Sequence, residues 1–119
     1  MINKIGFISY SVSNLRQSIE FYQDLLGLEL LLSDDRWAEF NISGQRLAIH
    51  KRNYEEVTGD QPGSTVYFEA NPIEDAVKKL RDKGVKFRGE IEVYSYGKLV
   101  LFLDPDKNPL GLYEPPAKN

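Results

Sequence analysis

The chain has no cysteine, and several other features are scarce or missing among its 119 residues. Without cysteine, the protein can have no disulfide, no thiolate metal site and no cysteine nucleophile. No apolar run approaches 18 residues, so we expect no membrane partner. Basic residues are scattered among acidic ones and the net charge is -3, so we expect no nucleic-acid partner. The first residues show no signal-peptide pattern, and a cytoplasmic location is the expectation.

Familiar catalytic motifs are missing as well. The sequence has neither a G-x-S-x-G nucleophile motif nor a phosphate-binding loop. Serine, acidic residues and a single histidine, His50, all occur. No spacing among them supports a catalytic triad.

What the sequence does contain is a repeat. Asn14 begins a helical pattern that ends at Gly27, and Asn71 begins a second one that ends at Gly84, so both ends are offset by 57 residues. Each pattern follows an alternating strand and precedes a stretch long enough for three more strands. The sequence therefore predicts an α+β fold of two βαβββ modules whose concave mixed sheets form a cleft. Within one domain, the expected parts are module 1 at residues 1–52, a linker at 53–62 and module 2 at 63–119.

The predicted strands alternate between apolar and polar residues, which is typical of a sheet with one covered face. In the strand 37–42, Ala38 and Phe40 lie on the face expected to pack against the helix. Trp37 and Glu39 then lie on the open face, where they line the cleft. Strands are predicted at residues 5–12, 28–32, 37–42, 46–50, 65–70, 85–87, 98–103 and 110–113.

Two local signals concern ends and turns. Asn71 is expected to cap the second helix, with Pro72 at the first helical position and Glu74 completing a capping box. Near the C-terminus, Asp104 and Asp106 lie in a dense turn signal. These two carboxylates could also suggest a metal site, but aspartate in such a turn usually bonds its own backbone.

Several phrases of the sequence resemble the vicinal oxygen chelate superfamily, which contains glyoxalase I, extradiol dioxygenases, fosfomycin-modifying enzymes and bleomycin-resistance proteins. The segments that carry this resemblance are Val12–Leu15, Ser18–Tyr22, Leu25–Leu28 and Asp104–Glu114. The resemblance covers nearly the whole chain and implies the same two-module fold. In the metal enzymes of this superfamily, His and Glu ligands on the first and last strand of each module hold a divalent ion.

Carried onto this sequence, the four ligand places fall at Phe7, His50, Thr65 and Gly111. Only His50 is a competent ligand, and a catalytic ion needs about three protein ligands. The resemblance therefore implies a member that has lost the metal site, with no metal and no other cofactor. Two other roles for His50 remain open, a hydrogen-bonding strand residue or a ligand contact.

The open faces of the predicted sheets carry aromatic walls and a few polar anchors, which is typical of a small-molecule pocket. Glu39 and Glu69 suit a cationic or amine-bearing ligand, and the two together are also a possible carboxylate metal site. The aromatic residues could instead fill the cleft or seal a dimer interface. The candidate ligand-binding residues are Phe7, Ser9, Trp37, Glu39, His50, Thr65, Tyr67, Glu69, Gly111 and Tyr113.

Three functions are compatible with these features. The first is a metal-free protein that sequesters or senses a small organic molecule, for example an antibiotic. The second is a glyoxalase-like lyase or dioxygenase-type enzyme that uses a divalent metal, or His50 or Glu69 as general base. The third is a purely interacting subunit. The resemblance implies a homodimer, because small members of this superfamily commonly pair. Exposed sheet edges and the long linker at residues 51–63 make exchange of modules between chains feasible.

Overall fold

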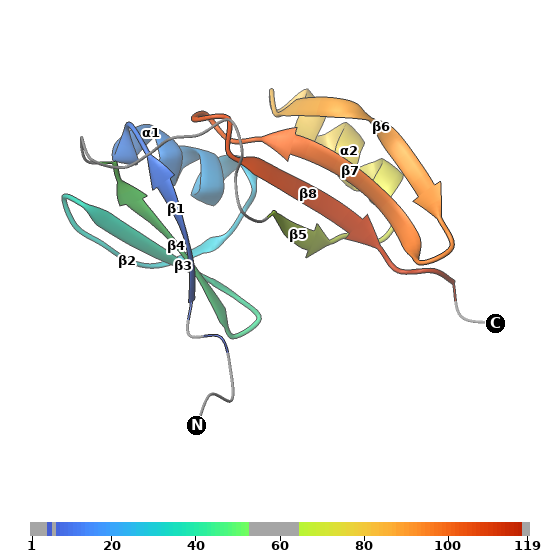
Figure 1. Ribbon diagram of the computed structural model, residues 1–119. Helices are drawn as coiled ribbons and strands as arrows, with labels where there is room; N and C mark the ends of the chain where they lie inside the picture. The colour runs from blue at the N-terminus through green and yellow to red at the C-terminus, as the bar shows by residue number, and fades with distance from the viewer. Residues whose placement is uncertain (1–4, 6, 53–64, 118–119) are drawn as a thin grey trace. The chain divides into compact units, whose positions relative to one another are not determined.

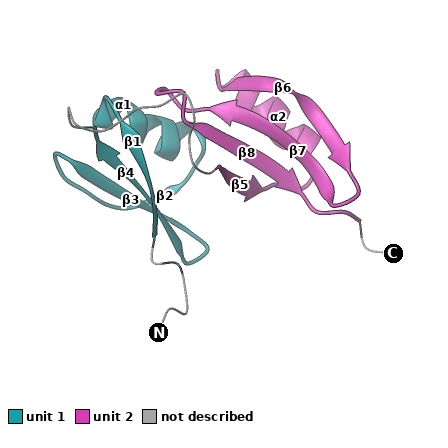
Figure 2. Cartoon of the chain, viewed as in Figure 1, with its two compact units in different colours: residues 1–58 teal, residues 59–119 magenta. Residues whose placement is uncertain are grey.

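The chain divides into two compact units, residues 1–58 and 59–119 (Figure 2). In each unit a strand, a helix and three further strands follow one another, which confirms the predicted fold class. The predicted linker lies within residues that the structure does not describe. This structure is a computed structural model, and it describes residues 5, 7–52 and 65–117.

Unit 1 contains a mixed four-stranded sheet in the order β1-β4-β3-β2 (Figure 1). Strand β1 runs parallel to β4, and the other neighbours are antiparallel. The helix packs on one face of this sheet, where the ring of Tyr22 contacts the ring of Phe40. The elements are β1 (Phe7–Val12), α1 (Leu15–Glu20), a π-helical turn (Phe21–Leu25), β2 (Glu29–Ser33), β3 (Trp37–Ile42) and β4 (Gln45–Lys51).

The first helix begins and ends where the sequence predicts. The side chain of Asn14 accepts a hydrogen bond of 3.0 Å from the backbone N–H of Gln17, as an N-cap does. Gly27 has a φ of 75°, a left-handed conformation that glycine adopts without steric cost and that ends the helix. None of the helices in the described part of the chain has the length and apolar character that crossing a membrane requires.

Unit 2 repeats the arrangement with a sheet in the order β5-β8-β7-β6, in which β5 and β8 are parallel. Strand β6 is much longer than the predicted strand 85–87. Its register shifts between Arg88 and Glu92, and this irregularity interrupts the alternation from which a strand is predicted. The elements are β5 (Val66–Glu69), α2 (Ile73–Asp82), β6 (Lys86–Tyr94), β7 (Gly97–Leu103) and β8 (Pro109–Glu114).

The predicted capping box of the second helix is wrong. The N-cap is Pro72, one residue later than predicted, and no side chain of the helix start caps it. Instead, Glu114 at the end of β8 accepts a hydrogen bond of 2.9 Å from the backbone N–H of Ile73. A carboxylate at a helix N-terminus satisfies an orphan donor and interacts favourably with the helix dipole. Glu74 bonds Lys98 Nζ at 2.7 Å rather than turning back to the cap.

The turn predicted at Asp104 forms as expected. Asp104 is buried, and its Oδ1 accepts hydrogen bonds of 2.8 Å from the backbone N–H groups of Asp106 and Asn108. Its Oδ2 accepts a further bond of 2.8 Å from Asn108 Nδ2. The carboxylate therefore organises the turn between β7 and β8, which is the structural role predicted for it.

Candidate functional site

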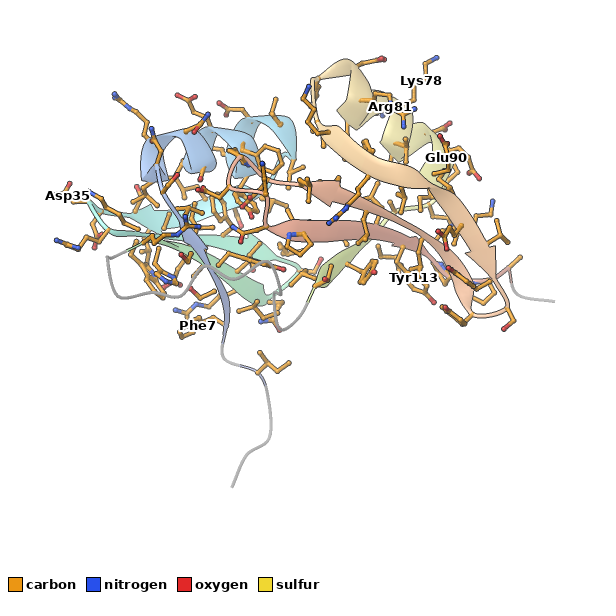
Figure 3. The ribbon with its side chains drawn as sticks, turned by 45° about the horizontal axis from the view of Figure 1, so that its top comes forward. Phe7, Asp35, Lys78, Arg81, Glu90 and Tyr113 are labelled. Carbon is orange, nitrogen blue, oxygen red and sulfur yellow. The ribbon has the colours of Figure 1, made fainter. Side chains whose placement is uncertain are left out.

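The candidate residues of unit 1 share the sheet face that points away from α1. Phe7 lies on that side of β1 in Figure 3. The strand register places His50 opposite Trp37, and Glu39 opposite Ala48. Because side chains alternate along each strand, these residues lie opposite the face that Phe40 shares with the helix. We call this surface the unit 1 face, and its members are Phe7, Ser9, Trp37, Glu39, Arg46 and His50.

Glu39 is the buried centre of the unit 1 face, with only 6% of its surface exposed. Its Oε2 accepts a hydrogen bond of 2.7 Å from Trp37 Nε1. Its Oε1 accepts a bond of 2.7 Å from Arg46 Nε and lies 2.5 Å from Arg46 Nη2. The bond from Trp37, and then the bond from Arg46, hold the pKa of the Glu39 carboxyl below its usual range.

These contacts change the role expected for Glu39. A carboxylate that already has an arginine partner within the protein is not available as the main anchor of a cationic ligand. The Arg46 side chain remains 46% exposed, so the ion pair has one buried and one accessible end. An ion pair of this kind fixes the orientation of the groups around it, here the indole of Trp37.

Aromatic contacts extend this network over the rest of the unit 1 face. The edge of Phe7 meets Trp37 with ring centroids 5.5 Å apart, and Trp37 stacks on His50 at 6.0 Å. The guanidinium of Arg46 lies 5.7 Å from the centroid of the Phe7 ring. Ser9 Oγ and His50 Nδ1 are hydrogen-bonded at 2.6 Å. All six side chains are thus linked, and the face is pre-organised without a ligand.

The candidate residues of unit 2 also share one sheet face, and two of them contact each other directly. Tyr67 pairs with Gly111 across the parallel strands β5 and β8. Its ring lies so close to Gly111 that a Cβ at position 111 would fall well inside van der Waals distance of Tyr67 Cδ1 and Cε1. The Tyr67 ring therefore occupies the space that a side chain at position 111 would need. Thr65 comes immediately before β5.

Further tyrosines continue this surface towards the β6–β7 hairpin. Tyr94 and Tyr96 stack with ring centroids 5.0 Å apart and an interplanar angle of 4°. The Tyr113 hydroxyl donates a hydrogen bond of 2.9 Å to the backbone carbonyl of Tyr96. The Tyr94 hydroxyl donates to the Glu92 carboxylate, and this bond raises the pKa of Tyr94. Figure 3 shows Tyr113 on the side of the sheet away from α2.

The residues at the four family ligand places do not fit a divalent metal. Phe7 and Gly111 have no donor atom, and Thr65 offers only a hydroxyl. His50, whose Nδ1 is hydrogen-bonded to Ser9, offers one ring nitrogen, and a single protein ligand does not hold a catalytic ion. Among residues 5, 7–52 and 65–117, no three His, Cys, Asp or Glu side chains lie close enough together to hold an ion.

A cavity of about 330 Å³ lies on the opposite side of unit 2, between α2 and β6. Lys78 and Arg81 of α2 and Glu90 of β6, all labelled in Figure 3, line this cavity. Its rim mixes charges of both signs, and its floor contains the core residues Val77 and Val100. No predicted candidate residue lines it. The remaining lining residues are Glu74, Asp82, Gly89 and Ile91.

Sequence reasoning left four residues of the two faces out of the candidate set. Alternation predicts Arg46 on the cleft face of its strand, together with His50. The residues 94–97 predict an aromatic turn or loop, with Tyr94 or Tyr96 near the mouth of the cleft. Glu92 gave no signal, because the irregular register of β6 hides the alternation of that strand.

The chain is similar to proteins of one large group. The family model described as Glyoxalase/Bleomycin resistance protein/Dioxygenase superfamily matches residues 4–112. The chain is 32% identical over 117 residues to the metallothiol transferase FosB of Staphylococcus haemolyticus (strain JCSC1435), and the match covers 95% of this chain and 84% of FosB.

Solved structures with the same fold include a fosfomycin resistance protein and an antibiotic binding protein. The fosfomycin resistance protein FosX of Listeria monocytogenes, complexed with Mn(II) and a sulfate ion, matches with a TM-score of 0.79 and 18% identity, covering 98% of this chain and 93% of FosX. TnmS3, an antibiotic binding protein from Streptomyces sp. CB03234, matches with a TM-score of 0.76 and 23% identity, covering 97% of this chain and 98% of TnmS3. At these identities the likeness shows the fold.

Proposed function

Because the chain belongs to the Glyoxalase/Bleomycin resistance protein/Dioxygenase superfamily, we propose that it is a member that binds a small organic molecule without a metal ion. The observation that carries this proposal is the ring of Tyr67 against Gly111. The family resemblance implies a glutamate ligand at this place, and here an aromatic ring takes its space. Phe7 replaces a second ligand with an aromatic ring in the same way.

The unit 1 face has the chemistry of a binding surface. Phe7, Trp37 and His50 offer aromatic rings, and the Glu39–Arg46 pair offers charged groups whose geometry is fixed. Aromatic walls with a few oriented polar groups are typical of small-molecule sites. TnmS3, which shares the fold, is an antibiotic-binding protein, and an antibiotic is accordingly one class of ligand for this chain.

A second candidate function is an enzymatic reaction on fosfomycin. The 32% identity with the metallothiol transferase FosB favours it, as does the fold shared with FosX. The lack of a donor atom at Phe7 and Gly111, and the lone hydroxyl of Thr65, argue against a metal-dependent form. A metal-independent form would use His50 or Glu69 as general base. Incubation of the protein with fosfomycin and a low-molecular-weight thiol, with and without Mn²⁺, followed by mass spectrometry of the products, tests this candidate.

Binding without a metal can be tested through the single tryptophan. We expect some members of a panel of planar and amine-bearing compounds to change the emission of Trp37. Isothermal titration of each hit in EDTA and then in Mn²⁺ completes the test. Equal affinity in both buffers supports the proposal. Affinity that vanishes in EDTA and returns with Mn²⁺, or a panel without any hit, contradicts it.

We also propose that the two units form one domain and that two chains associate as a homodimer in the cytoplasm. The sheets end in the edge strands β1 and β2 in unit 1 and β5 and β6 in unit 2, and such edges can pair with another chain. Light scattering at micromolar protein concentration tests the dimer, and a mass equal to the 13.6 kDa chain contradicts it.

A further inference from the structure

We propose that the open sheet face of unit 2 binds organic cations, such as small molecules that carry a quaternary ammonium group. This inference rests on the proposed function, because it treats the open sheet faces as ligand-binding surfaces. It adds the class of ligand and assigns it to a surface separate from the Trp37 network. We call this surface the tyrosine face, and its members are Tyr67, Glu69, Glu92, Tyr94, Tyr96 and Tyr113.

The first argument is the number of accessible aromatic rings. Tyr67, Tyr94 and Tyr96 are 43%, 40% and 57% exposed, although large aromatic side chains usually bury their rings in the core. Tyr94 and Tyr96 stack face to face, and the Tyr113 hydroxyl donates a hydrogen bond to the backbone carbonyl of Tyr96. Several π faces therefore gather in one small area, and such faces attract cations.

The second argument is the sign of the charge beside these rings. The strand register places Glu69, Tyr113, Leu99 and Glu92 in one row across the sheet. This row has a carboxylate at each end and no basic residue. A phenol is neutral at neutral pH, so the hydrogen-bonded Glu92–Tyr94 pair carries a single negative charge. A cation next to Tyr94 thus meets both a carboxylate and π faces.

Two basic residues on β6 and β7 lie outside this row. Lys98 lies on the opposite side of the sheet, where its Nζ is 2.7 Å from Glu74 and 3.7 Å from Glu114. Arg88 belongs to the next row, with Leu101, Gly111 and Tyr67. On the unit 1 face, by contrast, the central carboxylate has Arg46 as its partner. Charge complementarity therefore assigns a cation to the tyrosine face.

The test compares two probes of the same shape and different charge. Choline carries a quaternary ammonium group, and 3,3-dimethyl-1-butanol replaces that nitrogen with carbon. Each is titrated into the 119-residue protein with ¹³C-labelled tyrosine rings. We expect choline to shift the ring signals of Tyr94 and Tyr96 with a dissociation constant on the order of 1–10 mM. The neutral probe should bind at least about fivefold more weakly, because it lacks the cation–π attraction.

Matched variants separate the ring and the charge. Tyr96→Leu should weaken choline binding about twofold to fivefold, whereas Tyr96→Phe, which keeps the ring, should bind like the wild type. Glu92→Gln should also weaken binding about twofold to fivefold. Glu90→Gln removes the same charge from the same strand, but in the cavity beside α2, and should leave binding unchanged. Unchanged methyl signals from Val100 and Leu110, which are buried in unit 2, establish that this unit is folded in each variant.

The outcomes separate this inference from the proposed function. Equal shifts with both probes, or no shift with either, overturn the cation assignment, and so does equal weakening by the Glu90 and Glu92 variants. A choline response confined to Trp37 emission moves the cation to unit 1 and also overturns it, while metal-free binding by the protein would stand. Conversely, a compound panel that leaves Trp37 emission unchanged contradicts the proposed function. Choline-dependent shifts of the Tyr94 and Tyr96 signals would still support the cation site on the tyrosine face.

Discussion

The ring of Tyr67 on β5 lies against the backbone of Gly111 on the paired strand β8. Gly111 is buried although it has no side chain, because the tyrosine ring covers it. In metal-binding relatives the resemblance implies a glutamate ligand at this place. The ring and the missing side chain are complementary, so both positions must change together before a metal ligand could be accommodated.

The contact between Tyr67 and Gly111 predicts the effect of adding a single methyl group. Gly111→Ala should lower the free energy of unfolding by about 1–3 kcal/mol, because the Tyr67 ring must move away from the new Cβ. The double variant Tyr67→Ala/Gly111→Ala should lose less free energy of unfolding than the sum of the losses in the two single variants. Urea denaturation of the four proteins measures this coupling. Strictly additive losses would show that the ring does not cover Gly111 in solution.

The buried carboxylate of Glu39 predicts a pH-dependent contribution to stability. Glu39→Gln should lower the urea midpoint at neutral pH, because Arg46 then loses its charged partner. The pKa of Glu39 is lower in the folded protein than its ordinary value of 4.5, so this contribution is present above about pH 4.5. It is lost as the pH falls through the folded-state pKa.

The midpoint difference between the wild type and Glu39→Gln should therefore be constant near neutral pH and shrink below about pH 4.5. Glu20→Gln, an exposed substitution on α1, serves as the control and should change the midpoint little at any pH. A difference for Glu39→Gln that grows in acid would contradict the assigned hydrogen bonds.

The position of Trp37 on the unit 1 face predicts that its replacement weakens ligand binding but leaves the fold intact. Trp37→Ala should weaken the binding of any compound that contacts the unit 1 face, by about 1–3 kcal/mol for a planar ligand that stacks on the indole. The fold should persist, because Trp37 lies opposite the face that packs on the helix. Isothermal titration measures the affinity, and circular dichroism checks the fold. A ligand with equal affinity for wild type and variant does not use this face.

The hydrogen bond from Tyr94 to Glu92 predicts that the Tyr94 phenol ionises at a higher pH than an ordinary tyrosine. In the folded protein the carboxylate raises the pKa of Tyr94 above its ordinary value of 10.0. The stabilisation from this bond is present below about pH 10 and is lost as the pH rises through the folded-state pKa. Glu92→Gln should lower the pKa of Tyr94, as followed by the ¹³Cζ signal of its ring. An unchanged titration in Glu92→Gln would exclude this hydrogen bond.

The sequence alone determined the order of elements and the faces of the strands. The repeated pattern from Asn14 to Gly27 and from Asn71 to Gly84 predicted two βαβββ modules, and alternation placed Trp37 and Glu39 on the open face. These features could be predicted because they depend on near neighbours. A helix cap is a hydrogen bond between residues a few positions apart in the sequence, and successive side chains of a strand point to opposite faces of the sheet.

The tertiary structure decided which residues meet. Glu114 caps α2 through Ile73, and Ser9 bonds His50, each pair being 41 residues apart. Gly111 is covered by Tyr67 only because parallel pairing of β5 with β8 sets them in register. No local pattern encodes such contacts, since they depend on strand register and side-chain direction. The sequence therefore predicted the candidate faces, and only the folded sheets determined that Glu39 pairs with Arg46 and that Gly111 has no room for a side chain.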